Sequence, residues 1–162
     1  MTDHTSTEAA QGPRQPDPAL RALDHFVGTW EFTGHMLGSD DENIVGRATY
    51  RWLDGGFFLV QDIEIDFAGM FDVQSHEFIG FDPESGAFKS LVYSNMAPAP
   101  LPYTWEVQGR DVKITVDYAP LDATFTGRYT DDGSSFAGGW RPNPGADETV
   151  NVPYDISGSR VR

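Results

Sequence analysis

The residues best suited to acid–base chemistry are four histidines, in a chain that contains no cysteine. His76 is the strongest candidate, because it lies on a predicted strand and shares a face with Gln74 and Phe78. An inward His76 could orient a ligand or act as a general base, whereas an outward His76 would be an ordinary exposed residue, which we favour. No two of the histidines have a His-x-His or His-x-x-x-His spacing, so the sequence predicts neither a metal site nor a cofactor.

Three acidic residues, Asp62, Glu64 and Asp66, alternate along one segment. Carboxylates at this spacing could hold a hard cation, or they could form the solvated outer face of a strand. We favour the outer face, because the residues between and beside them are mostly apolar. The opposite face of this segment is apolar and carries Phe57, Leu59, Gln61, Ile63, Ile65 and Phe67. Gln61 is its one polar residue, so it requires a hydrogen-bond partner or a ligand.

Several reaction classes lack their sequence motifs. There is no Gly-x-Ser-x-Gly nucleophile motif, no phosphate-binding glycine loop and no βαβ pattern for a dinucleotide. The net charge of −14, from 25 acidic and 11 basic residues, opposes binding to nucleic acid or to an anionic membrane. Without a membrane-spanning apolar run or a signal-peptide core, the chain is expected to be cytoplasmic.

The elements that must position these residues are mainly strands. Residues 1–16 are polar and predict a disordered tail, and residues 17–162 predict one domain. Asp17-Pro18 is a typical helix start, so a short helix is expected from Pro18 to about His25. About ten alternating segments follow, which predicts an antiparallel up-and-down β-barrel. They are expected at 27–37, 44–53, 57–67, 73–81, 87–94, 103–108, 111–118, 123–130, 134–141 and 149–161.

Three motifs occur in a fixed order along the chain. They are Gly-Thr-Trp-Glu at 28–31, Trp-x-x-Gly-Gly-Phe-Phe-Leu at 52–59 and Gly-Phe-Asp-Pro-x-Ser-Gly at 80–86. The first resembles the opening of lipocalins and their calycin relatives. The order of all three resembles a bacterial lipocalin-like family, distantly similar to nitrobindin and fatty-acid-binding-type barrels. The resemblance covers roughly residues 20–162 and implies a barrel with an apolar interior.

The resemblance also implies roles for single residues. Lipocalins place a late basic residue against the tryptophan of the first strand, which implies that Arg160, or else Arg162, covers Trp30. A guanidinium above an indole is worth about 0.5–2 kcal/mol. Nitrobindins bind haem through a late histidine, and no histidine follows His76 here. The sequence therefore does not predict haem binding in that manner.

Aromatic and apolar residues on the predicted strands could line a cavity or fill the barrel completely. Our first hypothesis is that the cavity binds a small, largely apolar molecule, with the loop near Met96 to Pro102 as a lid. The second is an enzyme in which His76 and a tyrosine perform acid–base catalysis. The third is a filled scaffold with an interaction surface, for example a homodimer. The candidate ligand-binding residues are Tyr50, Trp52, Phe57, Leu59, Gln61, Ile63, His76, Tyr93, Tyr103 and Trp105.

Overall fold

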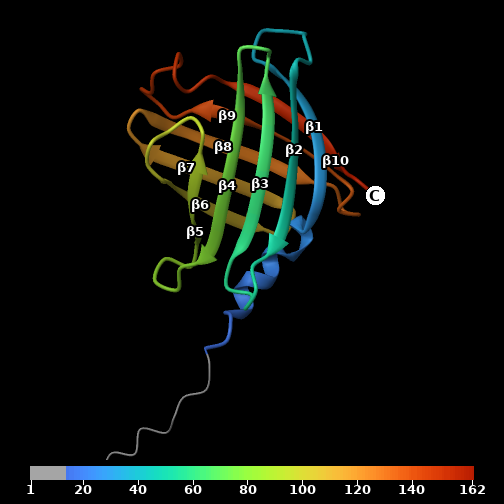
Figure 1. Ribbon diagram of the computed structural model, residues 1–162, viewed down its shortest axis with the longest axis vertical. Coiled ribbons are helices and arrows are strands. Elements are labelled where there is room, and N and C mark those ends of the chain that lie inside the picture. The colour runs from blue at the N-terminus through green and yellow to red at the C-terminus, as the bar shows by residue number, and fades with distance from the viewer. Residues whose placement is uncertain (1–13) are drawn as a thin grey trace, which may run out of the picture.

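Ten antiparallel strands follow one short helix, and the last strand hydrogen-bonds to the first to close a barrel (Figure 1). The computed structural model describes residues 14–162, so residues 1–13 of the predicted tail lie outside the described part. The all-β, up-and-down barrel of about ten strands is confirmed. The strands are β1 (Gly28–Met36), β2 (Ile44–Trp52), β3 (Leu59–Phe67), β4 (Phe71–Phe81), β5 (Phe88–Ser94), β6 (Leu101–Gln108), β7 (Asp111–Tyr118), β8 (Leu121–Tyr129), β9 (Ser135–Pro142) and β10 (Tyr154–Arg160).

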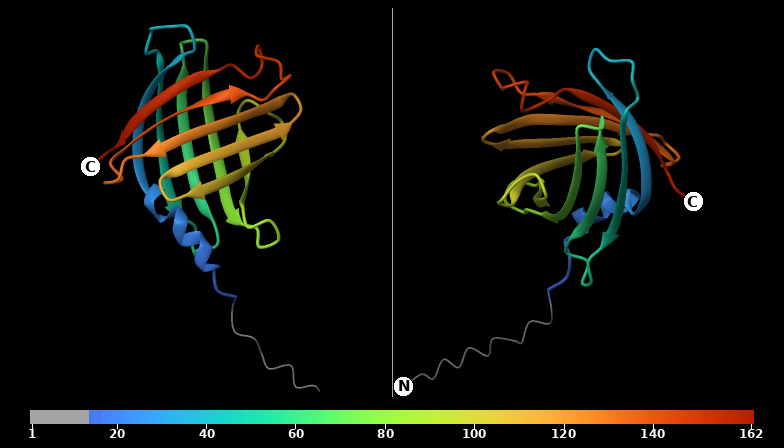
Figure 2. Two further views of the ribbon diagram at one scale, coloured as in Figure 1. Left: turned by 180° about the vertical axis from the view of Figure 1, so that it is seen from behind. Right: turned by 45° about the horizontal axis from the view of Figure 1, so that its top comes forward.

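The helix η1 (Pro18–Phe26) closes one end of the barrel (Figure 2). It begins as the sequence predicts, since the Asp17 side chain accepts a hydrogen bond from the amide of Ala19 over 2.8 Å. It is a 3-10 helix, in which residues three apart share one face. That spacing places Leu20, Leu23 and Phe26 together on the buried side. Within residues 14–162, no helix has the length and apolar character needed to cross a membrane.

Trp30 and Arg160 join the helix to the barrel wall. They are directly paired between β1 and β10, and the guanidinium lies 4.4 Å from the centre of the indole ring. Arg160 also donates to the carbonyl oxygens of His25, over 2.6 Å, and of Val27. The indole Nε1 of Trp30 donates to the carbonyl of Phe26 over 2.8 Å. The end of η1 is therefore tied to both strands that complete the closure.

Three strands, β4, β6 and β8, each begin two residues earlier than the sequence predicts. β6 starts at Leu101 and includes Pro102, although a proline cannot donate a ladder hydrogen bond. In β6 this is possible because the β6–β7 ladder begins only at Tyr103, so Pro102 lies outside that ladder and pairs only with Leu91 of β5. Five loops at the end opposite η1 connect strands of this barrel. They are residues 37–43, 68–70, 95–100, 119–120 and 143–153.

Candidate functional site

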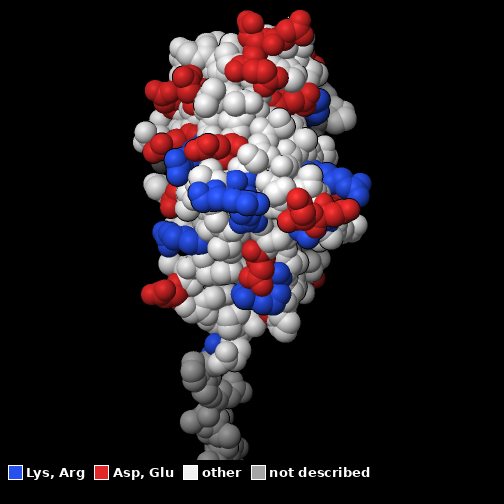
Figure 3. Space-filling model, turned by 90° about the vertical axis from the view of Figure 1, so that its right-hand side faces the viewer, with Lys and Arg blue, Asp and Glu red and all other residues white. Residues whose placement is uncertain are grey.

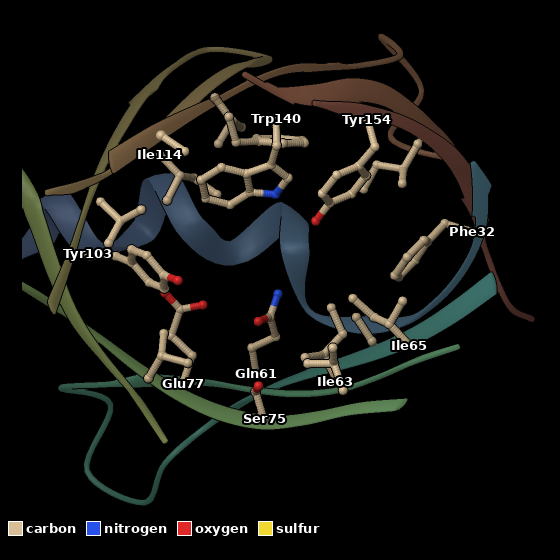
Figure 4. A pocket seen from close by; sticks show the side chains of 18 of the residues that line it. Phe32, Gln61, Ile63, Ile65, Ser75, Glu77, Tyr103, Ile114, Trp140 and Tyr154 are labelled. Carbon is tan, nitrogen blue, oxygen red and sulfur yellow. The ribbon is translucent and has the colours of Figure 1, made fainter. Parts of the chain in front are cut away.

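The barrel interior contains a cavity of about 290 Å³ above the helix (Figure 4). Aromatic and aliphatic side chains form most of its wall, and a few polar groups point into it. Since pockets for small molecules combine an apolar wall with a few placed polar groups, this cavity has the composition of a binding site. The polar groups come from Tyr50, Gln61, Ser75, Glu77, Tyr103, Asn151 and Tyr154.

Five of the ten sequence-predicted binding residues line this cavity: Tyr50, Gln61, Ile63, Tyr103 and Trp105. Gln61 finds the partner that its apolar surroundings require, because its Nε2 donates to the Tyr50 hydroxyl over 2.5 Å. The structure therefore brings together a polar pair and an aromatic wall contributed by β2, β3 and β6.

His76 lies on the outside of the barrel, the placement favoured from the sequence, so its inclusion among the candidate ligand-binding residues is corrected. Its side chain is 65% exposed, and its Nδ1 lies 2.5 Å from Oδ1 of Asp62 on the outer face of β3. The register explains the placement, since Asp62 and His76 are directly paired, as are the inward residues Gln61 and Glu77. The enzyme hypothesis based on an inward His76 therefore loses its base.

Four other predicted residues also lie away from the cavity wall. Trp52 donates to Asp24 of η1 over 3.0 Å and lies under the Arg21 guanidinium, so it anchors the helix. Leu59 is fully buried in the core. Phe57 precedes β3 and is 38% exposed. Tyr93 is 48% exposed, because the inward residues of β5 are the alternate ones: Phe88, Ser90 and Val92.

Glu77 is the principal polar residue of the cavity, and the sequence analysis did not single it out. Its side chain is 5% exposed. One carboxyl oxygen, Oε1, accepts hydrogen bonds from the Ser90 hydroxyl over 2.7 Å and from the Trp105 indole over 2.8 Å. No group within residues 14–162 donates to Oε2, and the carboxyl group points into the cavity (Figure 4). Glu77 can therefore offer a free carboxyl oxygen to a ligand.

Burial controls the protonation of this site. Desolvation raises the pKa of Glu77 to about 7, although the hydrogen bonds from Ser90 and Trp105 act in the opposite direction. Burial and the nearby Glu77 carboxylate raise the pKa of Tyr103 to about 12 and shift that of Tyr50 further upward. Near neutral pH the tyrosines are therefore neutral hydrogen-bonding groups, and Glu77 is the group that titrates.

The hairpin register contained a signal for Glu77. The turn between β3 and β4 is centred on Gly69, and residues equally distant from it are paired. Counting outward from Gly69 places Glu77 opposite Gln61, on the face that the apolar pattern of β3 marks as inward. An acidic residue at such a position must be buried in the wall, and its partners then come from the neighbouring strands.

Comparison with known proteins places the chain in a family. Residues 15–131 match the family model DUF1579, described as a protein of unknown function. The chain belongs to DUF1579. No curated protein matches it significantly.

Three solved structures are similar to this DUF1579 chain at low sequence identity. The crystal structure of Rv2717c from M. tuberculosis has a TM-score of 0.59 at 13% identity, and the match covers 91% of this chain and 100% of that one. A de novo designed fluorescence-activating β-barrel has a TM-score of 0.46 at 12% identity, covering 86% and 97% of the two chains. The design EF1p2_mFAP2b bound to DFHBI has a TM-score of 0.42 at 11% identity, covering 88% and 99%. The likeness to Rv2717c concerns the fold alone.

The mouth of the cavity in this DUF1579 chain is formed by a different loop from the one expected. The predicted lid, Met96 to Pro102, contributes no residue to the cavity wall, whereas Val150, Asn151 and Val152 of the loop 143–153 do. Asn151 holds that loop in place, because it accepts from the Asp122 amide over 2.9 Å and donates to the Pro120 carbonyl over 3.2 Å. The loops 119–120 and 143–153 are thus coupled at the rim.

The part of the chain that the structure describes contains no set of side chains suited to bind a metal ion. Residues 14–162 contain no group of three histidine, aspartate or glutamate side chains arranged to hold an ion. Asp62, Glu64 and Asp66 lie on the outer face of β3, with Asp62 paired to His76. The period-two spacing of these acids is the spacing of a strand face.

Proposed function

We propose that this DUF1579 chain binds a small, largely apolar molecule inside its barrel. The observation that carries the proposal is the cavity of about 290 Å³, closed at one end by η1 and lined by aromatic and aliphatic side chains. A barrel of this kind can be filled by its own side chains, but here inward alanines such as Ala48 and Ala123 leave space. The free polar atoms of Glu77 and Tyr154 would orient the ligand.

Rings that pack against one another give the cavity a rigid wall. The ring of Trp140 lies 5.7 Å from that of Phe125 and 6.1 Å from that of Tyr103, measured between centroids. Phe26 of η1 stacks 5.7 Å from Tyr50 and forms part of the core beneath the cavity. A preformed apolar wall loses little conformational entropy on binding, which favours affinity for a small ligand.

The proposal is tested by native mass spectrometry of the protein purified from its own host, with a cavity-blocking variant. Wild type should carry a bound small molecule, and Ala123→Phe, which fills the cavity from β8, should lose it. The matched control is Ala137→Phe, on the exposed face of β9, which should keep the ligand. Ala48→Leu on β2 is a second, smaller obstruction if the first variant unfolds.

A wild-type protein that carries no molecule, and whose thermal unfolding no apolar compound shifts, would overturn the proposal. Retention of the ligand by folded Ala123→Phe would place the ligand outside the barrel. The homodimer named in the third hypothesis stays a prediction. The exposed side chains of Phe58, Leu91 and Tyr93 line an outer groove that could form its interface.

A further inference from the structure

The cavity wall carries a carboxyl group and no side chain that could neutralise it. Within residues 14–162, none of the lining residues is lysine, arginine or histidine. A ligand with its own carboxylate would therefore find no cation inside and would face Glu77. When Glu77 is ionised, two negative charges in a poorly solvated site repel each other, so the wall then disfavours anionic ligands such as fatty acids.

The arrangement of donors around Glu77 leaves one direction for a ligand. Ser90 and Trp105 both donate to Oε1, from β5 and β6. Oε2 receives no hydrogen bond from residues 14–162 and faces the cavity, so it is open to a hydrogen bond from a bound molecule. A donor group on the ligand would satisfy it. We propose, resting on the cavity-binding function above, that the ligand carries a protonated amine that pairs with Oε2 of Glu77.

The surroundings of Glu77 suit a cation. The rings of Tyr103 and Trp140 and the hydroxyl of Tyr154 lie around the same space (Figure 4). Aromatic faces attract an ammonium group by about 0.5–2 kcal/mol, more when water is excluded. The apolar body of the ligand would pack against other apolar residues of the wall, such as Ile63, Ile65 and Ile114.

The loops at the open end of the barrel carry negative charge, which is opposite to the charge of the proposed ammonium group. The five loops at that end contain Asp40, Asp41, Glu42, Asp147 and Glu148 and no lysine or arginine. In the space-filling view, acidic side chains gather at the top, which is the end opposite the helix (Figure 3). Such a rim raises the local concentration of cations and lowers that of anions. The rim and Glu77 thus favour the same class of ligand.

Three probes that share one indole body test the inference: tryptamine, tryptophol and indoleacetate. They differ in carrying an ammonium, a hydroxyl or a carboxylate group. We expect calorimetry near neutral pH to give tryptamine an affinity at least about tenfold higher than that of tryptophol, with indoleacetate weakest. Equal affinities, or tightest binding of indoleacetate, would overturn the inference.

The variant Glu77→Gln removes the charge and keeps an acceptor for Ser90 and Trp105. It should lower the affinity for tryptamine by about tenfold or more. It should leave the affinity for tryptophol within about threefold, which also shows that the cavity is intact. The control Glu64→Gln, on the exposed face of β3, should change neither affinity. An unchanged affinity for tryptamine in folded Glu77→Gln would contradict the pairing.

Wild-type protein alone provides a second test that needs no folded variant. The other titratable side chains of the cavity wall within residues 14–162 are Tyr50, Tyr103, Tyr129 and Tyr154, and burial raises the pKa of each, so all four remain neutral in this range. Because tryptamine requires ionised Glu77, its affinity should fall about tenfold per pH unit below the pKa of that carboxyl. The affinity for neutral tryptophol should stay constant, and parallel pH profiles for the two probes would overturn the inference.

The outcomes separate the two proposals. If tryptophol binds and tryptamine is not preferred, the amine inference fails while cavity binding stands. If neither probe binds and the protein from its own host carries no molecule, cavity binding fails and the inference falls with it.

Discussion

The indole Nε1 of Trp105 on β6 donates to Oε1 of Glu77 on β4 over 2.8 Å, although β5 lies between these strands. Ser90 of β5 donates to the same oxygen over 2.7 Å. Three neighbouring strands are therefore tied together through one buried carboxyl oxygen. The stability of the wall and the chemistry of the cavity both depend on this group.

Glu77 should make stability depend on pH. Its folded-state pKa of about 7 lies above the unfolded value of about 4.3, so between these values only the folded state holds the proton. Unfolding then releases a proton, and stability falls as the pH rises until the folded carboxyl also ionises. The free energy of unfolding of Glu77→Gln, measured relative to that of wild type, should therefore be roughly 3 kcal/mol higher at about pH 8 than at about pH 4. Urea unfolding at both pH values measures the gain, and a constant difference would contradict it.

Removal of the Trp105 donor should weaken the same cluster. Trp105→Phe keeps an aromatic ring but deletes the hydrogen bond to Oε1, which should lower the unfolding free energy by about 1.5–3 kcal/mol when Glu77 is ionised. The control is Trp140→Phe, whose indole also lines the cavity but does not donate to Glu77. Carbon NMR of the Glu77 carboxyl should show a higher pKa in Trp105→Phe alone. An unchanged pKa would show that the indole does not stabilise the carboxylate.

The alternating pattern of the strands predicts much of this site. Two candidate residues that lie outside the cavity, His76 and Tyr93, belong to strands whose two faces are both mixed in polarity. The apolar face of β3 is unambiguous, so Gln61 and Ile63 could be placed inside from the sequence. Both faces of β4 are mixed, because His76 and Glu77 each have apolar neighbours two residues away. The same holds for β5, where Tyr93 alternates with Val92. Alternation alone cannot orient such strands: β4 is oriented by its register against β3, and β5 by its register against β4.

Gly28 should tolerate no side chain, because its φ is +127° and an added Cβ would lie 2.5 Å from Nη1 of Arg160. Gly28→Ala should therefore displace the guanidinium from Trp30 as well as strain the backbone, at a cost of about 2–4 kcal/mol. Gly38→Ala is the control, since its φ of +84° is also unfavourable but no atom lies within 4 Å of the added Cβ. It should cost about 1 kcal/mol. Thermal unfolding of the two variants compares the costs, and equal losses would show that Arg160 is not displaced.

His76→Ala should leave ligand binding unchanged, because the imidazole lies on the outer face beside Asp62. An exposed pair of this kind contributes about 0–1 kcal/mol to stability, so the variant should fold normally. Titration with tryptophol provides the measurement. A several-fold loss of affinity in the folded variant would show that the outer face participates in binding.

The most direct test of the account is methyl NMR of isoleucine-labelled wild-type protein titrated with tryptamine. Ile63 and Ile114 line the cavity, whereas Ile44 and Ile79 are fully buried and do not line it. Ring currents from a bound indole should shift the methyl resonances of the first pair and leave those of the second nearly unchanged. Nuclear Overhauser contacts should join the indole to Ile63 and Ile114. Methyl resonances of Ile63 and Ile114 that do not move at saturating probe would contradict an occupied barrel.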